Sequence, residues 1–327
     1  MLVLVLQFLG GLLLLLGGGE SLVRGAGAIA RGLGVPPVAV GLTVVAFGTS
    51  APEFVVAVTG AATGAGGIAF GNVVGANIIN IAFILGLTAV LNPLIVHPTI
   101  ITRELPMLLL AMCAAFVLSL DQLLDGSVNM LQRGDGLILC LLFAVFLYYS
   151  VMALRKSGSD EFVDAAEAVG WRVRVKSMLP SASLVLAGLV GLGIGGSLLV
   201  SAAVDIAGQL GMTPAAVGLT IVAIGTTFPE LATSILAARK GEADLAIGNV
   251  VGSNIFNILL VLGTASAVAP FEVPARGPVS LAIGTGLTLL LILLIHTGKL
   301  RIHRVQGLLL LGVFVSYMAW VLISTVK

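Results

Sequence analysis

Two glutamates stand inside apolar stretches of the chain, each at the end of a similar short motif. Glu53 closes the hexapeptide GTSAPE, and Glu230 closes GTTFPE. The proline before each glutamate removes a backbone donor and clashes with the carbonyl four residues earlier, so a helix kinks or splits there. Carbonyl oxygens freed around Thr49 and Thr226, beside a carboxylate, are ligands of the kind that hard cations prefer. We therefore predict an all-oxygen cation site at these two breaks.

The stretch around Glu53 is repeated around Glu230. Residues 37–86 align with residues 214–263 without a gap, at a constant offset of 177, and 26 of the 50 positions are identical. PVAVGLTVVAFGTSAPE lies over PAAVGLTIVAIGTTFPE, and AFGNVVGANIINIAFILG lies over AIGNVVGSNIFNILLVLG. Each copy supplies its own glutamate, so a site formed where the copies meet would contain two carboxylates.

The negative charge of these glutamates requires a positive partner. An intramembrane charge costs at least about 2.5–3.5 kcal/mol, and neither copy carries a Lys or Arg in the core of its apolar spans. The partner is then mobile: a divalent metal ion, Na⁺ or a proton. With three histidines and two cysteines the chain has no nitrogen and sulfur cluster for zinc, and its net charge of +1 does not favour nucleic acid.

A second motif, GNVVG followed by two further asparagines, adds amide groups to each copy. Asn77 and Asn80 are three residues apart and share a helix face, as do Asn254 and Asn257. We expect one member of each pair to meet the ions. In the alternative interpretation the asparagines only link helices by hydrogen bonds. The six matched positions are Asn72, Asn77, Asn80, Asn249, Asn254 and Asn257.

The elements that must position these groups are membrane-spanning helices. Of 327 residues, 58% are hydrophobic and 9% are charged, and the mean hydropathy is +1.17. The apolar runs are too long and too continuous for barrel strands, so the predicted fold class is an all-α integral membrane protein with ten transmembrane helices. The runs are 2–31, 37–63, 67–96, 105–120, 137–154, 180–208, 214–238, 245–270, 278–297 and 305–326.

The chain divides into two five-helix halves joined by a polar connection. We predict a first repeat at 1–154, a cytoplasmic linker at 155–179 and a second repeat at 180–327. Because five spans precede the linker, the second repeat crosses the membrane in the opposite sense. Thirteen of the 16 Lys and Arg then lie on the linker side. Basic residues resist translocation, so both termini are expected on the non-cytoplasmic side of the cell (inner) membrane.

The paired motifs resemble the two alpha-repeats of the calcium/cation antiporter superfamily, in particular prokaryotic sodium/calcium exchangers. GTSAPE with GNVVGANIIN, and GTTFPE with GNVVGSNIFN, carry this resemblance across essentially the whole chain. It implies a non-enzymatic antiporter without a cofactor that exchanges Ca²⁺ for Na⁺ by alternating access, through sliding of the first and sixth spans. Its expected partners are these ions and the lipid bilayer, with no obligatory protein partner evident.

The resemblance also implies which residues bind the ions. Glu53 and Glu230, with the Thr49 and Thr226 carbonyls, would bind Ca²⁺, and the same glutamates would bind Na⁺. Further sodium ligands would be Ser50, Thr227, Ser253 and the Ala46 and Ala223 carbonyls, while Asn80 and Asn257 line the centre. Two positions depart from the commonest prokaryotic pattern. Ala76 stands where the other copy has Ser253, which removes a hydroxyl ligand, and Asn257 stands where many relatives have aspartate.

Other functions use some of the same residues. A proton/calcium antiporter would use the same glutamates, because a buried carboxyl group can carry protons. Asn257, which stands where many relatives have aspartate, favours a sodium/calcium exchanger over a potassium-dependent one. A serine hydrolase built on Ser50 needs a histidine base, but His97, His296 and His303 lie near span ends. A cation channel would need the oxygens but not the inversion, and conductance measurements would separate it from an exchanger.

Overall fold

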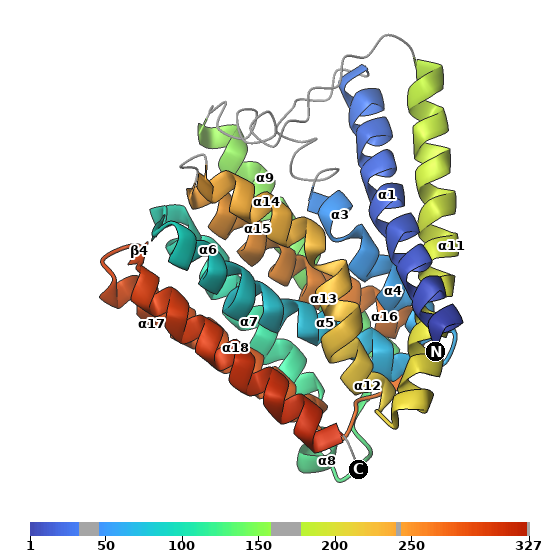
Figure 1. Ribbon diagram of the computed structural model, residues 1–327. Coiled ribbons are helices and arrows are strands. Elements are labelled where there is room, and N and C mark those ends of the chain that lie inside the picture. The colour runs from blue at the N-terminus through green and yellow to red at the C-terminus, as the bar shows by residue number, and fades with distance from the viewer. Residues whose placement is uncertain (33–45, 158–177, 240–242, 326–327) are drawn as a thin grey trace.

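The chain folds into a bundle of helices (Figure 1). The computed structural model describes residues 1–32, 46–157, 178–239 and 243–325. Within these residues, eight helices are long and apolar enough to cross a membrane, and a bent pair of helices forms a ninth such unit. The prediction of a helical membrane protein is confirmed. Residues 37–45 of the first repeated stretch and 158–177 of the linker lie outside the described residues.

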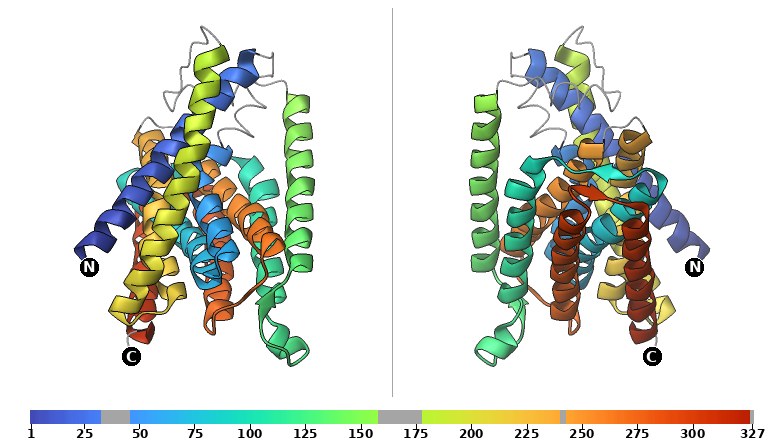
Figure 2. Two further views of the ribbon diagram at one scale, coloured as in Figure 1. Left: turned by 90° about the vertical axis from the view of Figure 1, so that its right-hand side faces the viewer. Right: turned by 90° about the vertical axis from the view of Figure 1, so that its left-hand side faces the viewer.

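Two long helices form one flank of the bundle. They are α1 (Leu2–Gly32) and α11 (Met178–Leu210), which lie side by side in both views of Figure 2. Glycines let their backbones approach closely: a Cβ on Gly11 would come within 2.8 Å of the Leu199 nitrogen, and one on Gly18 within 2.8 Å of the Leu192 nitrogen. The two helices therefore pack backbone against backbone, and a side chain at either glycine would separate them.

Both glutamate motifs interrupt a helix, as predicted. In the first copy α3 (Ala46–Thr49) ends one residue before α4 (Ala51–Ala62), which has proline in its first turn. In the second copy the axis bends by 46° where α14 (Phe228–Arg239) follows the preceding helices. Those preceding segments are α12 (Pro214–Val217), the π-helical η4 (Gly218–Val222) and α13 (Ala223–Thr226).

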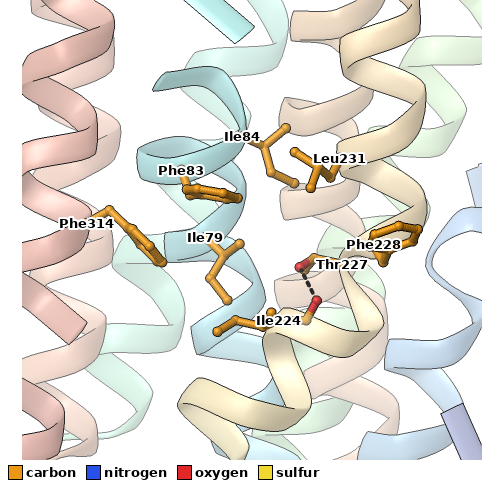
Figure 3. A pocket seen from close by; sticks show the side chains of 8 residues that line it. All are labelled: Ile79, Phe83, Ile84, Ile224, Thr227, Phe228, Leu231 and Phe314. Atoms are coloured by element: carbon orange, nitrogen blue, oxygen red, sulfur yellow. Dashed lines mark hydrogen bonds between the residues drawn. The ribbon is translucent and has the colours of Figure 1, made fainter. Parts of the chain in front are cut away.

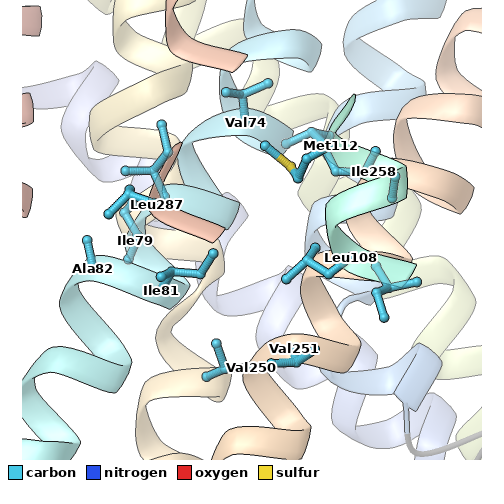
Figure 4. Packing of buried hydrophobic residues seen from close by; sticks show 14 of the residues in the cluster. Val74, Ile79, Ile81, Ala82, Leu108, Met112, Val250, Val251, Ile258 and Leu287 are labelled. Carbon is cyan, nitrogen blue, oxygen red and sulfur yellow. The ribbon is translucent and has the colours of Figure 1, made fainter. Parts of the chain in front are cut away.

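The helices that carry the asparagine motifs are the innermost. In one, α5 (Gly66–Ile78) continues through the π-helical η2 (Ile79–Leu85) into α6 (Gly86–Leu91). The other is built in the same way, from α15 (Ala243–Phe256), η5 (Asn257–Leu262) and α16 (Gly263–Val268). Their apolar side chains, with those of neighbouring helices, form the main core, part of which is shown in Figure 4. The amides of these motifs are thus held in the centre of the bundle.

Four further long helices of the described residues surround this centre, together with one short helical turn and short strands. The helix after the first motif begins at η3 (Ile100–Glu104) and continues as α7 (Leu105–Leu118), so it includes Arg103 and Glu104, which pair with each other. The others are α9 (Arg133–Ser157), α17 (Gly277–Thr297) and α18 (Arg304–Thr325), with the single turn α8 (Asp121–Leu124).

Two antiparallel strand pairs join the halves of the chain. Strand β1 (Leu94–Ile95) pairs with β4 (Arg301–Ile302), and β2 (Met130–Leu131) pairs with β3 (Phe271–Glu272). Each pair takes one strand from each half. In Figure 1 the β4 label stands at the left of the bundle, beside the upper ends of α17 and α18, and the α9 and α11 ends that flank residues 158–177 lie near the top. The N mark stands at the right and the C mark at the bottom.

Candidate cation site

The two helix breaks place Glu53 and Glu230 in the buried centre of the protein. The side chains are 0% and 1% exposed, respectively. Each glutamate lies in the first turn of the helix that follows its break, α4 or α14. The unpaired N–H groups of a first turn carry partial positive charge, which favours a carboxylate there. The breaks thus give both acids a partly compensating environment, but not a full countercharge.

Hydroxyl groups from two different segments meet the Glu230 carboxyl group. Ser50 Oγ, at the break between α3 and α4, donates to Glu230 Oε1 at 3.3 Å, and Ser253 Oγ on α15 donates to the same oxygen at 3.4 Å. The two hydroxyl oxygens are themselves 3.5 Å apart. Thr49 also interacts with this carboxyl group. A residue beside Glu53 in the sequence is therefore bound to the glutamate of the other copy, as expected for one shared site.

The two carboxylates have no basic partner among the described residues. Ion pairs in this part of the chain join Arg24 to Glu20 and Arg103 to Glu104, away from the centre. Both carboxyl oxygens of Glu53, and Oε2 of Glu230, are buried without a hydrogen-bond donor in the described structure. The two acids are close enough to interact through their charges. Two buried like charges with unfilled lone pairs are stable only with a cation or protons between them.

Asn72 connects the two broken helices. Its Nδ2 donates to the backbone carbonyl of Glu53 at 3.3 Å, and its Oδ1 accepts a hydrogen bond from Thr226 Oγ1 at 3.0 Å. The Thr226 hydroxyl also interacts with the Glu53 carboxyl group, although its proton is directed to Asn72. Asn72 was not among the predicted site residues. The available signal was its place as the first asparagine after the first helix break, as Asn249 is after the second.

The asparagines at positions 77, 80, 254 and 257 differ in how many of their side-chain polar atoms are hydrogen-bonded. Asn77 Nδ2 donates to the Asn254 carbonyl at 3.2 Å, and Asn254 Nδ2 donates back to the Asn77 carbonyl at 3.1 Å. Asn80 Nδ2 donates to Asn254 Oδ1 at 2.8 Å. In the described structure Asn77 Oδ1, Asn80 Oδ1 and both amide atoms of Asn257 are buried without a partner. Asn77, Asn80 and Asn254 therefore link helices, and Asn77, Asn80 and Asn257 keep polar atoms available in the interior.

The Thr227 side chain is hydrogen-bonded within its own helix and lines an apolar pocket. Its hydroxyl donates to the Ala223 carbonyl at 2.8 Å, and that oxygen also accepts from the Thr227 backbone N–H at 3.0 Å. Thr227 lines an apolar pocket of about 180 Å³ together with residues such as Ile79, Phe228 and Phe314 (Figure 3). Ala46, the first residue of α3, would contribute only its backbone. Coordination by Thr227, Ala46 and Ala223 stays a prediction.

The assembled groups are suited to binding a hard cation. No cluster of three or more His, Cys, Asp or Glu occurs within the described ranges, so the candidate ligands are two carboxylates with hydroxyl, amide and carbonyl oxygens. Ca²⁺ and Na⁺ bind such oxygen sets. Nucleophilic catalysis by Ser50 is not supported, because its hydroxyl donates to Glu230 while His97 is exposed and contacts Thr99.

Comparisons with known proteins agree with this chemistry. Residues 3–152 and 180–323 match the family described as sodium/calcium exchanger protein. The chain is 39% identical over 272 residues to the putative antiporter CaxA of Alkalimonas amylolytica, covering 82% of this chain and 83% of that protein. It is 31% identical over 301 residues to the sodium/calcium exchanger MaX1 of Methanosarcina acetivorans, covering 83% and 84%.

A solved structure gives the same result for the fold. The sodium-calcium exchanger NCX_Mj, in a crystal soaked with Na⁺ and Sr²⁺, matches this chain with a TM-score of 0.63 and 32% identity. The match covers 98% of this chain and 99% of that chain. The similarity therefore includes both halves of the bundle and the centre in which the glutamates lie.

Proposed function

This chain belongs to the sodium/calcium exchanger family, and we propose that it moves Ca²⁺ across the membrane in exchange for Na⁺. The observation that carries the proposal is the pair of buried carboxylates, Glu53 and Glu230, without a basic partner in the described residues. One Ca²⁺ neutralises both charges, and sodium ions can replace it. Exchange follows because an empty pair of facing carboxylates is unfavourable in a dry interior.

We assign the ligands by charge and position. Glu53 and Glu230, with the carbonyls of Thr49 and Thr226, form the calcium position in the proposal. Sodium binds to the same carboxylates with additional oxygens. Support for the hydroxyl assignments comes from Ser50 and Ser253, whose contacts to Glu230 place oxygens beside a carboxylate. The additional sodium ligands are Ser50, Thr227, Ser253, Ala46 and Ala223, and Asn80 and Asn257 line the centre.

The proposed architecture is ten spans in two inverted five-helix repeats. Supporting it, η2 and η5 are π-helical segments at nearly the same place in the two asparagine helices. Asn77 and Asn254, which correspond at the repeat offset, exchange equivalent hydrogen bonds. The strand pairs are also related, because each joins a strand of one half to a strand of the other. Inverted repeats allow a central site to face each side in turn.

Movement of α1 and α11 as one body is the proposed basis of alternating access. Their glycine contacts hold them together, and they pass beside the breaks. A Cβ on Gly48 at the first break would overlap the Val23 side chain of α1. We further propose that the linker side is cytoplasmic and that the protein lies in the cell (inner) membrane. The exposed Lys299, Arg301 and Arg304 around β4 support this orientation.

Transport into proteoliposomes tests the choice of driving ion. Vesicles loaded with Na⁺ are placed in sodium-free medium with radiolabelled Ca²⁺, and uptake is compared with that driven by a pH gradient of matched size. The proposal predicts uptake that requires internal Na⁺. Uptake that follows the pH gradient and is indifferent to Na⁺ would instead establish proton/calcium antiport.

Substitution of either glutamate tests the site. Glu53→Gln or Glu230→Gln leaves one carboxylate, which only half neutralises a divalent ion, so calcium uptake should fall to that of protein-free vesicles. Glu20→Gln is the matched control, because Glu20 is exposed on α1 and pairs with Arg24, and it should transport normally. Near-normal uptake in either central variant would refute the assignment.

A further inference from the structure

The two glutamates occupy corresponding positions in the repeats, but their hydroxyl neighbours differ. On the Glu230 side, Ser50 and Ser253 both donate to Oε1, at 3.3 and 3.4 Å. All three side chains are buried. This oxygen set is already gathered around one carboxylate in the described structure. A sodium ion that binds there meets oxygens that need little rearrangement, and preorganised ligands bind more tightly.

The positions that correspond in the repeat to Ser253 and Ser50 offer fewer hydroxyl groups to Glu53. The counterpart of Ser253 is Ala76, which is fully buried on α5 and has no side-chain oxygen. The counterpart of Ser50 is Thr227, whose hydroxyl donates to the Ala223 carbonyl at 2.8 Å and lines the apolar pocket of Figure 3. Both Glu53 carboxyl oxygens lack a hydrogen-bond donor within the described residues. The nearby Thr226 hydroxyl directs its proton to Asn72.

Sodium and calcium respond differently to this inequality. A monovalent ion interacts with one carboxylate and depends on neutral oxygens to complete its shell, whereas a divalent ion between two carboxylates has a stronger electrostatic interaction. Loss of a hydroxyl therefore weakens a sodium position more than the shared calcium position. The difference in hydroxyl ligands between Glu53 and Glu230 therefore affects the binding of Na⁺ more than the binding of Ca²⁺.

We propose that the two carboxylates form unequal sodium positions: a strong one at Glu230 with Ser50 and Ser253, and a weak one at Glu53, where Ala76 removes a ligand. This inference rests on the proposed exchange function and adds the order in which Na⁺ fills the site. Sodium binds first at Glu230. The second position fills only at high Na⁺ concentration, so the dependence of calcium uptake on Na⁺ is shallow and extended.

The test moves the hydroxyl from one side to the other. Calcium uptake into proteoliposomes is measured as a function of internal Na⁺ for the wild type, Ala76→Ser, Ser253→Ala and the double variant. Ala69→Ser is the control, because Ala69 is a buried alanine two turns earlier on α5 that packs beside Gly60. Sodium-dependent protection of the detergent-purified protein against heat gives a second readout that does not need transport.

Opposite shifts are expected from the two single variants. Ala76→Ser should lower the half-saturating Na⁺ concentration about threefold to tenfold and steepen the curve, and Ser253→Ala should raise it by a similar factor, as for one hydrogen-bonding ligand. The double variant should return toward the wild type, and Ala69→Ser should match the wild type. The half-saturating Ca²⁺ concentration should change less than twofold in the single variants.

Three other outcomes would contradict the inference or the proposed function. If Ala76→Ser leaves both the sodium curve and the thermal protection unchanged while Ser253→Ala shifts them, the Glu53 side is not limited by its missing hydroxyl and the inference is wrong. If Ala76→Ser does not fold, Ser253→Ala decides, because an unchanged sodium curve in that variant refutes a strong position at Glu230. If the wild type shows no sodium-driven calcium uptake, the proposed function itself fails.

Discussion

Asn72 offers a sharp test of how the glutamates are held, because its two hydrogen bonds join both broken helices. Asn72→Ala removes the donor to the Glu53 carbonyl and the acceptor of the Thr226 hydroxyl. The hydroxyl has another acceptor, since Thr226 Oγ1 also lies 3.4 Å from the Ala223 carbonyl. The Glu53 carbonyl keeps the helical hydrogen bond from the N–H four residues later in α4 and loses its second donor, the Asn72 amide.

The expected free-energy cost of Asn72→Ala follows from the hydrogen bonds that it removes. Because both affected groups keep another partner, the cost is that of one hydrogen bond inside a protein, about 0.5–1.5 kcal/mol. Because the affected carbonyl belongs to Glu53 itself, we expect much of this cost to appear as misplacement of its carboxylate. A change of about 1.4 kcal/mol is a tenfold change in affinity. Asn72→Ala should therefore raise the half-saturating Ca²⁺ concentration about threefold to tenfold.

The corresponding asparagine of the other copy is the matched control. Asn249 is half-buried and donates to the hydroxyls of Thr233 and Ser234, at 3.0 and 3.2 Å, rather than to the backbone of Glu230. Asn249→Ala should change the half-saturating Ca²⁺ concentration less than about threefold. Sodium-driven uptake of radiolabelled Ca²⁺ measures both variants. Equal effects, or a larger effect at Asn249, would show that Asn72 does not position Glu53.

Three further predictions concern packing and coupling in the bundle. Gly18→Ala should lower the thermal stability of the purified protein, because its Cβ would meet the Leu192 backbone, whereas Gly17→Ala, with open space around it, should not. Asn80→Ala and Asn254→Ala should be non-additive in thermal stability, with a coupling of about 0.5–3 kcal/mol as expected for contacting residues; additive effects would contradict the hydrogen bond from Asn80 Nδ2 to Asn254 Oδ1. Gly48→Ala should slow calcium uptake more than Gly225→Ala, because the Gly48 Cβ would overlap Val23 while the Gly225 Cβ would lie 3.2 Å from Leu12; equal rates would argue against close contact of α1 with the first break.

The helices and their interruptions could be predicted because their causes are local in sequence. Hydropathy locates the apolar spans, and Pro52 and Pro229 lie at the points where two of these helical spans are interrupted. The apolar run at 105–120 is short for a span, which predicts that its helix extends into Arg103 and Glu104. The helix does include both residues, which pair with each other, and it begins at Ile100.

The unequal surroundings of the two glutamates could not be predicted with the same success. The repeat makes Ser50 and Thr227 equivalent in sequence, and both carry a hydroxyl. Their rotamers differ, because Ser50 reaches Glu230 whereas Thr227 donates to its own helix. A threonine inside a helix often donates to the carbonyl four residues earlier, and its methyl group favours the apolar pocket. Which competing acceptor is chosen depends on contacts between segments far apart in the chain.

The mutual hydrogen bonds of Asn77 and Asn254 have a consequence for how the protein switches. Under the proposed inversion, each residue is the image of the other, and so are the two bonds between them. If the two halves exchange conformations during transport, Asn77 takes the environment of Asn254 and Asn254 takes that of Asn77, so the same two hydrogen bonds are present before and after the exchange. The pair can therefore act as a fixed point whose hydrogen-bond energy is the same in the inward-facing and outward-facing states. The bound ions and the flanking helices then determine which side of the membrane the site faces.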